Sequence, residues 1–267
     1  MAKFTKIITS IMVMAALLIP TTEVAAQKRK TTTAKKTSTA KTQAKPAAKP
    51  AAKPFDLSDK YYEGLLKIKG QPMDIFGALT LNESEGSFDF AGAVQLPFKY
   101  TAKEAGGKVT LTFSSEKLSA TLTSTDKGGS FEGTISMAGN SMQAWLLSVN
   151  PDHKIPDMTD EELLEVVSNP DGYTVFVIGE QGGQKVMFPA DMTLNGDTKT
   201  YSTKFDNAIV QNIFGKFYGK YEVKDKKLYL SDSEGTSSSG PIYDNGTYIL
   251  IPMGSAQGFN FTICLMR

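Results

Sequence analysis

The amino-acid sequence predicts an all-β protein: two tandem antiparallel β-barrel or β-sandwich units of about eight short strands each, joined by one short helix. Three observations support this prediction. Apolar and polar residues alternate with a period of two after residue 55, and turn residues interrupt the alternation every eight to twelve residues. A thirteen-residue stretch occurs twice, at 70–82 and 183–195. One segment, 151–171, has the spacing of an amphipathic helix.

The repeated stretch reads GQPMDIFGALTLN in its first copy and GQKVMFPADMTLN in its second, 113 residues later. Further matches, at offsets of 113 and 121 residues, pair Gly133-Thr134 with Gly246-Thr247 and Lys99-Tyr100 with Lys220-Tyr221. Self-similarity of this kind indicates a repeated structural unit, and changes of offset are expected where loops differ in length. We therefore predict that a β domain at 172–267 repeats a β domain at 55–150.

The N-terminus has the anatomy of a secretory signal peptide. Lys3 and Lys6 precede an apolar run at 7–19, and Val24-Ala25-Ala26 is a small-residue cleavage site, so we predict a signal peptide over 1–26. The run is shorter than the roughly 20 residues of a spanning helix. We expect an exported protein, periplasmic or secreted to the cell surface, with no transmembrane segment in the mature chain. An uncleaved N-terminal anchor is the alternative.

Residues 27–54 form a basic segment without large apolar residues, which predicts a disordered Lys/Ala/Pro linker. Its basic residues are Lys28, Arg29, Lys30, Lys35, Lys36, Lys41, Lys45, Lys49 and Lys53. From Phe55 onward there are 18 basic and 27 acidic residues, a net charge of −9. The linker is predicted either to dock on an anionic envelope surface or to act as a plain spacer. Nucleic acid is not expected as a partner, because no aromatic residues interrupt the lysines.

Strands are predicted at 65–69, 74–82, 87–90, 97–101, 108–113, 117–123, 131–137 and 142–149 in the first unit. In the second unit they are predicted at 175–178, 186–194, 200–205, 209–214, 217–223, 227–230, 247–251 and 259–265. The segment 231–240 is predicted to be the loosest loop, and Asp244-Asn245-Gly246 a tight turn. In the last strand, Cys264 falls on the face opposite Phe261 and Leu265, either as a partly exposed thiol or as a buried residue.

The bridging segment 151–171 contains the one helix that the sequence predicts. Thr159 and Glu162 form a capping box, and Leu163 and Val167 lie on one apolar face. Asn169-Pro170 ends the pattern.

The hairpin pattern Lys-Tyr-x-x-Lys before a tight turn and Lys-x-x-Leu after it occurs at 220–224 and 227–230. Together with the strand count, it resembles the tandem lipocalin-like (calycin-type) small β-barrel domains of secreted bacterial envelope proteins. The resemblance implies a barrel fold and a ligand-holding function. The Gly-x-Trp opening of lipocalins is missing, since the sole tryptophan, Trp145, lies in the last predicted strand of the first unit.

Few residues suit catalysis or metal binding. His153 is the only histidine and Cys264 the only cysteine, and no nucleophile elbow accompanies them. We predict a solvated linker histidine, no metal site and no cofactor. Acidic residues cluster around the helix, namely Asp157, Asp160, Glu161, Glu162 and Glu165. Helix-start acids are usual, yet a carboxylate pair of a hydrolase remains an alternative.

The segment 214–221, FGKFYGKY, is the candidate binding site, because aromatic rings beside lysines suit sugar rings or an anionic polymer. Its candidate residues are Phe214, Lys216, Phe217, Tyr218, Lys220 and Tyr221. The alternative is a core strand with a bulge at Gly215 or Gly219. We predict a non-enzymatic exported binding module for a lipid, glycan or protein. The alternatives are a structural or interaction component of an envelope assembly and a carboxylate-based hydrolase.

Overall fold

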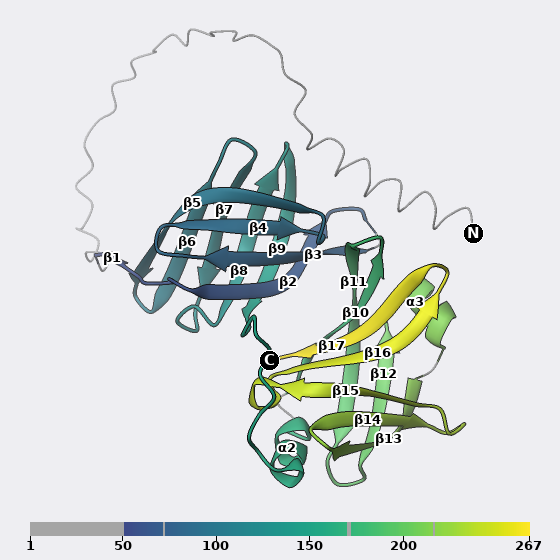
Figure 1. Ribbon diagram of the computed structural model, residues 1–267. Coiled ribbons are helices and arrows are strands. Elements are labelled where there is room, and N and C mark those ends of the chain that lie inside the picture. The colour runs from purple at the N-terminus through teal and green to yellow at the C-terminus, as the bar shows by residue number, and fades with distance from the viewer. Residues whose placement is uncertain (1–50, 72, 170–171, 216) are drawn as a thin grey trace, which may run out of the picture. The chain divides into compact units, whose positions relative to one another are not determined.

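The fold is built almost wholly from antiparallel strands (Figure 1). The computed structural model describes residues 51–267 apart from 72, 170–171 and 216. The predicted signal peptide, the linker up to residue 50 and the candidate site residue Lys216 lie outside the described residues. No helix among the described residues is long and apolar enough to cross a membrane.

Strands β2 to β9 form a closed eight-stranded antiparallel barrel. They are β2 Lys60–Ile68, β3 Asp74–Leu81, β4 Glu85–Phe90, β5 Val94–Ala105, β6 Lys108–Ser114, β7 Leu118–Ser124, β8 Ser130–Met137 and β9 Asn140–Ser148. Each strand pairs with the next, and β2 also pairs with β9 from Tyr62↔Ser148 to Ile68↔Met142, which closes the ring. The first strand of the described residues is β1 Lys53–Pro54, which pairs with β5, so the last two residues of the predicted linker belong to the fold.

The interior of this barrel is filled by its own side chains. Alternate residues of the strands point inward, and those with no accessible surface are Tyr62, Leu66, Leu79, Leu81, Phe88, Phe90, Leu111, Leu122, Phe131, Ile135 and Leu146. A side chain without accessible surface borders no space that admits a water molecule. These side chains therefore leave no room for a ligand among them, which is one of the two ways in which an eight-stranded barrel is filled.

Further strands follow in the same antiparallel order. They are β10 Thr174–Gln181, β11 Gln184–Asn195, β12 Thr200–Phe205, β13 Phe217–Lys224, β14 Lys227–Asp232, β15 Ser237–Tyr243, β16 Tyr248–Ala256 and β17 Phe259–Met266. Each pairs with the next, and β10 also pairs with β17 from Thr174↔Met266 to Glu180↔Asn260. Val177, Leu228, Ile249 and Leu265 are fully buried on these strands.

The predicted helix is confirmed as α2 Asp160–Val167. The Thr159 Oγ1 accepts from the Glu162 N–H at 3.2 Å, and the Glu162 carboxylate accepts from the Thr159 N–H at 2.7 Å, which is the predicted capping box. Leu163 and Val167 are fully buried, so α2 packs through the apolar face that its sequence predicts.

The predicted strand at 209–214 is wrong, because this segment is helix α3 Ala208–Phe214. Val210 and Phe214 stand four residues apart, a helical spacing that the β-branched residues of the segment obscure. Val210 is fully buried, and the Phe214 ring packs edge-on against Phe261 with centroids 5.2 Å apart. Gly215, at φ 61°, ends the helix in the left-handed conformation. The sequence therefore predicted one helix where the described residues contain two.

The predicted loop at 231–240 is also partly wrong. Strand β15 begins at Ser237 and pairs with β14 from Lys227↔Pro241 to Ser231↔Ser237. Backbone hydrogen bonds to β14 hold this serine-rich stretch, although its side chains carry no apolar alternation. The Asp244-Asn245-Gly246 turn is confirmed and forms the short 3-10 helix η1 Asp244–Gly246.

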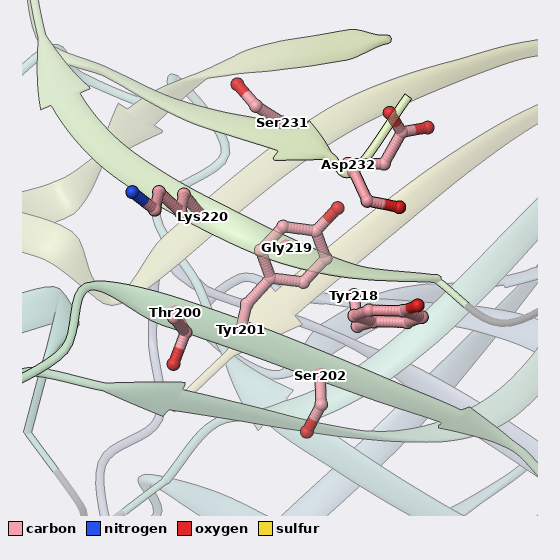
Figure 2. Close-up of a pocket in the computed structure, with 9 residues that line it drawn as sticks. Thr200, Tyr201, Ser202, Tyr218, Gly219, Lys220, Ser231 and Asp232 are labelled. Carbon is pink, nitrogen blue, oxygen red and sulfur yellow. The ribbon is translucent and has the colours of Figure 1, made fainter. Parts of the chain in front are cut away.

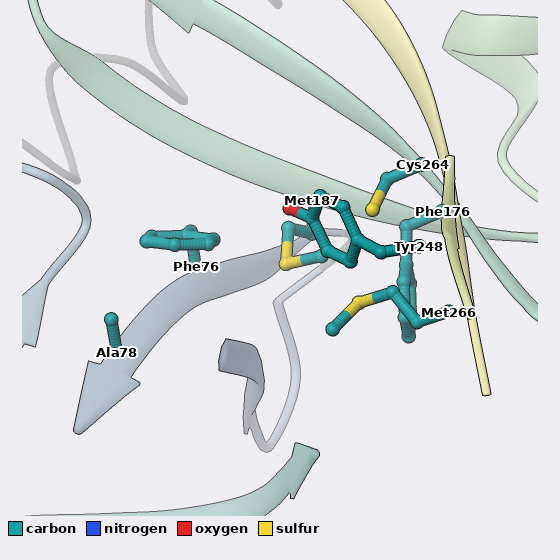
Figure 3. Close-up of a cluster of buried hydrophobic side chains, with 7 residues drawn as sticks. All are labelled: Phe76, Ala78, Phe176, Met187, Tyr248, Cys264 and Met266. Carbon is teal, nitrogen blue, oxygen red and sulfur yellow. The ribbon is translucent and has the colours of Figure 1, made fainter. Parts of the chain in front are cut away.

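Several strands are buried on both faces, because the two sets of strands pack against each other through an apolar seam (Figure 3). The residues of this seam are Phe76, Ala78, Phe176, Met187, Tyr248, Cys264 and Met266. Strand β3 also pairs with β11 over two positions, Asp74↔Met187 and Ile75↔Val186. The seam decides the environment of Cys264, whose thiol is buried and whose pKa burial raises.

A carboxylate lies beside the seam and accepts a hydrogen bond at each of its two oxygens. Glu63, on β2, is 9% exposed and accepts hydrogen bonds of 2.7 Å from the hydroxyls of Tyr61 and Tyr248. Burial foremost, together with the Glu63 charge, raises the pKa of Tyr248, so the phenol keeps its proton. The Tyr248–Glu63 bond ties β16 to β2 across 185 residues of sequence.

We expect Phe176→Ala to lower the free energy of unfolding by about 3–5 kcal/mol, since it opens a cavity in the seam. Urea denaturation followed by the fluorescence of Trp145, which packs 5.8 Å from the Phe176 ring, measures this change. The control is Ile155→Ala, because Ile155 is 52% exposed. Equal effects of the two substitutions would contradict a seam that stabilises the fold.

We expect Asp74→Asn to stabilise the protein near neutral pH. Burial raises the pKa of the Asp74 carboxyl above 3.8, although Lys67 opposes the shift, so the folded state binds the proton more tightly than the unfolded state. The contribution of Asp74 to stability therefore falls as the pH rises from 3.8 through its folded pKa, and the asparagine variant lacks this fall. Urea midpoints measured between about pH 3.5 and pH 7 test this prediction, and Asp197→Asn, at an exposed position, is the control. The prediction is contradicted if the difference in urea midpoint between Asp74→Asn and wild type does not widen as the pH rises.

Candidate functional site

A surface hollow of about 560 Å³ lies over β12, β13 and β14, and it contains part of the segment that the sequence singles out (Figure 2). Its lining residues are Thr200, Tyr201, Ser202, Tyr218, Gly219, Lys220, Ser231, Asp232 and Ser233. Three consecutive residues from each of three strand segments thus make the site. Antiparallel pairing sets their order across the sheet.

One face of the site carries an aromatic ring and a cation. Tyr218 and Lys220 alternate with inward residues on β13, and both are exposed. Register places Lys220 between Thr200 and Ser231, and places Tyr218 opposite Ser202. Tyr218 is 51% exposed, and only one other large apolar residue of the described chain is exposed to this degree. A flat apolar ring therefore stands among hydroxyl groups and beside an ammonium group.

The middle row of the site is Tyr201–Gly219–Asp232, aligned across the three strands. A Cβ on Gly219 would collide with the Ser231 backbone carbonyl, so only glycine allows β13 and β14 to approach this closely. Figure 2 shows the Tyr201 ring extending from β12 across β13 at Gly219. Because glycine has no side chain, a buried residue of β12 borders the same hollow as the exposed residues of β13.

Tyr201 carries an unused hydrogen-bonding group. The residue is 3% exposed, and its hydroxyl is buried without a hydrogen-bond partner among the described residues. Burial foremost, and the nearby Asp232 carboxylate, raise its pKa to about 12, so the hydroxyl is protonated at neutral pH. A buried hydroxyl without a partner costs about 1–3 kcal/mol.

The Asp232 carboxylate supplies the acidic end of the site. Its Oδ1 accepts from the Glu234 N–H at 2.9 Å and from the Thr236 N–H at 2.8 Å, which fixes the turn after β14. A carboxylate held in this way keeps acceptor capacity on its other oxygen. Lys220 and Asp232 thus lie in neighbouring rows of the sheet, and both line the hollow.

The structure brings together only part of the sequence-predicted site. Tyr218 and Lys220 line the hollow. Phe217 packs against the Tyr201 ring with centroids 5.1 Å apart, and Phe214 packs against Phe261. Tyr221 is buried, and its hydroxyl lies 2.6 Å from Ser168 Oγ. Of the described candidates, Tyr218 and Lys220 are therefore exposed on β13, whereas Phe217 and Tyr221 of β13 and Phe214 of α3 pack within the fold.

The residues that sequence reasoning missed come from neighbouring strands. Tyr201 and Asp232 have no local pattern that marks them, since their role follows from facing Gly219 across the sheet. A correct strand register for β12–β14 would have found them. The false strand at 209–214 prevented that register, because it placed an extra strand between β12 and β13.

A second polar cluster lies around His153, which is not the solvated linker residue that the sequence predicted. Its ring stacks on Tyr248 at 4.3 Å and 9°, and its side chain is 23% exposed. His153 Nδ1 lies 3.6 Å from Asp244 Oδ2, and both atoms are buried without a hydrogen-bond partner in the described chain. The backbone N–H of Lys154 donates to the Asp244 carboxylate, and its C=O accepts from the Asp244 N–H. This cluster therefore fastens the bridging segment 151–171 to η1.

Two acidic residues of α2, Asp160 and Glu162, accept hydrogen bonds from backbone groups. Asp160 accepts from the backbone N–H groups of Lys226 and Asp225 at 3.0 and 2.9 Å, and these bonds, that of Lys226 foremost, lower its pKa. The Thr159 backbone N–H likewise lowers the pKa of Glu162. A general acid needs a raised pKa, so neither carboxylate suits the general-acid role in a hydrolase. No group of three or more potential metal ligands occurs within residues 51–267 as far as they are described.

Comparison with known proteins adds no relative: the chain matches no protein-family model, no curated protein and no solved structure. The chemistry of the hollow is therefore what indicates a function for this chain.

We expect Tyr201→Phe to raise the free energy of unfolding by about 1 kcal/mol, because it removes a buried hydroxyl that no protein group satisfies. Tyr221→Phe is the matched control and should lower it by about 1 kcal/mol, since its hydroxyl is bonded to Ser168. Urea denaturation of both variants measures the difference. A loss of stability in Tyr201→Phe would mean that the hydroxyl has a partner in solution.

Proposed function

We propose that this protein is a non-enzymatic, exported binding module that holds a glycan in the hollow on β12–β14. One observation carries the proposal: an exposed tyrosine ring stands in a hollow bordered by hydroxyl groups, a lysine and a carboxylate. Sugar rings have an apolar face that stacks on aromatic rings and a periphery of hydroxyls that need donors and acceptors. Tyr218 supplies the aromatic ring for stacking. Asp232, Lys220 and the serines supply the hydrogen-bond donors and acceptors.

Burial supports a surface site over an interior one. Most of the large side chains inside the β2–β9 barrel have no accessible surface, whereas a lipid needs an enclosed apolar cavity of several hundred Å³. Of the three ligand classes that the sequence left open, a glycan makes the best use of an open surface hollow that combines an aromatic ring with hydroxyl groups and charged side chains.

We also infer that the two sets of eight strands are copies of one β unit. The repeated stretch covers β3 and β11, each second in its set of eight, and the matched Lys-Tyr pairs lie on β5 and β13, each fourth. The register pairs Asp74 with Met187, positions that are 113 residues apart and equivalent in the repeat. Equivalent residues that pair antiparallel are related by a local two-fold axis. These relations support tandem barrels of the lipocalin-like kind at 55–150 and 172–267, bridged by 151–171.

The same proposal includes export and attachment. The signal peptide at 1–26 directs the chain across the membrane, and the basic linker lets the glycan-binding body reach from an anionic envelope surface. The body carries a net charge of −9 from Phe55 onward, so the linker and the body differ in sign.

The test is a binding screen of the full mature chain against a panel of neutral and acidic oligosaccharides. Tyr218→Ala should weaken the bound saccharides about ten-fold, because it removes the stacking surface, and calorimetry measures the change. The control is Ile155→Ala, which removes the other large exposed apolar side chain of the described residues. Absence of binding to every saccharide, or equal binding by Tyr218→Ala, would overturn the proposal.

A further inference from the structure

A second hollow, of about 350 Å³, lies over β4, β5 and β6 and includes Lys99, Glu85 and Ser114 in its lining. These strands are third, fourth and fifth counted from β2, as β12, β13 and β14 are counted from β10. The two hollows therefore occupy the same position in the strand order.

Strand register shows that the two hollows correspond residue by residue. Lys99 lies between Glu85 and Ser114, and its sequence match Lys220 lies between Thr200 and Ser231. Two residues earlier on the central strand, Pro97 corresponds to Tyr218. The lysine and the serine are thus common to both hollows, and the aromatic platform belongs to one.

The residue pair behind the lysine supports the correspondence. In the first hollow Gly86 faces Phe98, and in the second Tyr201 faces Gly219. A Cβ on Gly86 would lie 2.7 Å from the Phe98 ring, so the glycine makes room for the ring across the strand. Both sets of strands thus pair one aromatic residue with one glycine at this position. The central strand carries the aromatic residue in the first hollow and the glycine in the second.

The charge around the lysine differs between the hollows. Lys99 Nζ lies 4.0 Å from Glu85 Oε1, and both side chains are exposed. Thr200 takes the place of Glu85 in the second hollow, and Lys220 forms no ion pair with the described residues. The ammonium group of Lys99 is therefore partly neutralised, whereas that of Lys220 can receive an external anion.

We propose that the hollow on β12–β14 selects an acidic saccharide and that Lys220 binds its carboxylate; this inference rests on the glycan-binding function proposed above. The Asp232 carboxylate orients the ligand, because it repels an acid group and accepts bonds from sugar hydroxyls. The acid group therefore lies at the Lys220 side, and neutral hydroxyls lie at the Asp232 side. Thr200 makes the selection by leaving the lysine without a protein counter-charge.

The experiment uses oligogalacturonate and its carboxyl methyl ester, which differ in charge and share their sugar ring. Calorimetry on the full mature chain at low salt should show about five-fold tighter binding of the acid form, as expected for one partly exposed ion pair. Lys220→Met should abolish the preference. Thr200→Glu should also abolish it, because it rebuilds the Glu85–Lys99 arrangement around Lys220. Lys99→Met is the matched control and should leave the preference unchanged.

Two results would overturn the inference and leave the glycan-binding function intact. One is equal affinity of the wild type for the acid and the ester; the other is binding of neutral panel saccharides at Tyr218 with no binding of either probe. A preference that persists in Lys220→Met would also overturn it, since another group would then hold the carboxylate. Failure of every saccharide on the panel to bind overturns the proposed function itself.

Discussion

The structure between residues 53 and 267 depends on the burial of strand faces that a single barrel would leave in water. Strands β3, β10 and β17 bury one face inside their own set of strands and the other in the seam. Apolar burial is the main stabilising contribution to folding, so the seam joins the two sets of strands into one body. Glu63 fits this apolar region because two tyrosine hydroxyls donate to its carboxylate.

Filling of the barrel interior has a direct consequence for function. When inward side chains occupy the space inside an eight-stranded barrel, recognition has to use the outer surface and the gaps between strands. Gly219 allows this, because it has no side chain. The backbones of β13 and β14 lie close together at Gly219, and Tyr201 of β12 borders the surface hollow there. The candidate site thus arises from close strand packing, and a rigid sheet holds its residues in place.

The two hollows lie at the same place in the strand order and differ in their chemistry. Both contain a lysine and a serine, while tyrosine and threonine in the second hollow stand where proline and glutamate stand in the first. Each difference concerns a side chain on the outward face and leaves the strand pairing intact. Sheet surfaces tolerate such changes because outward residues contribute little to the core.

The sequence by itself determined the all-β class, most strand positions and the capped helix α2, because alternation and capping are local patterns. It also marked Tyr218 and Lys220 through their aromatic and basic character. Only the tertiary structure decided that Tyr201 and Asp232 join them, that 209–214 is a helix, and that His153 and Cys264 are enclosed. The physical reason is common to all of these: each depends on strand register or on the burial of a second face, and both are set by residues far away in the sequence.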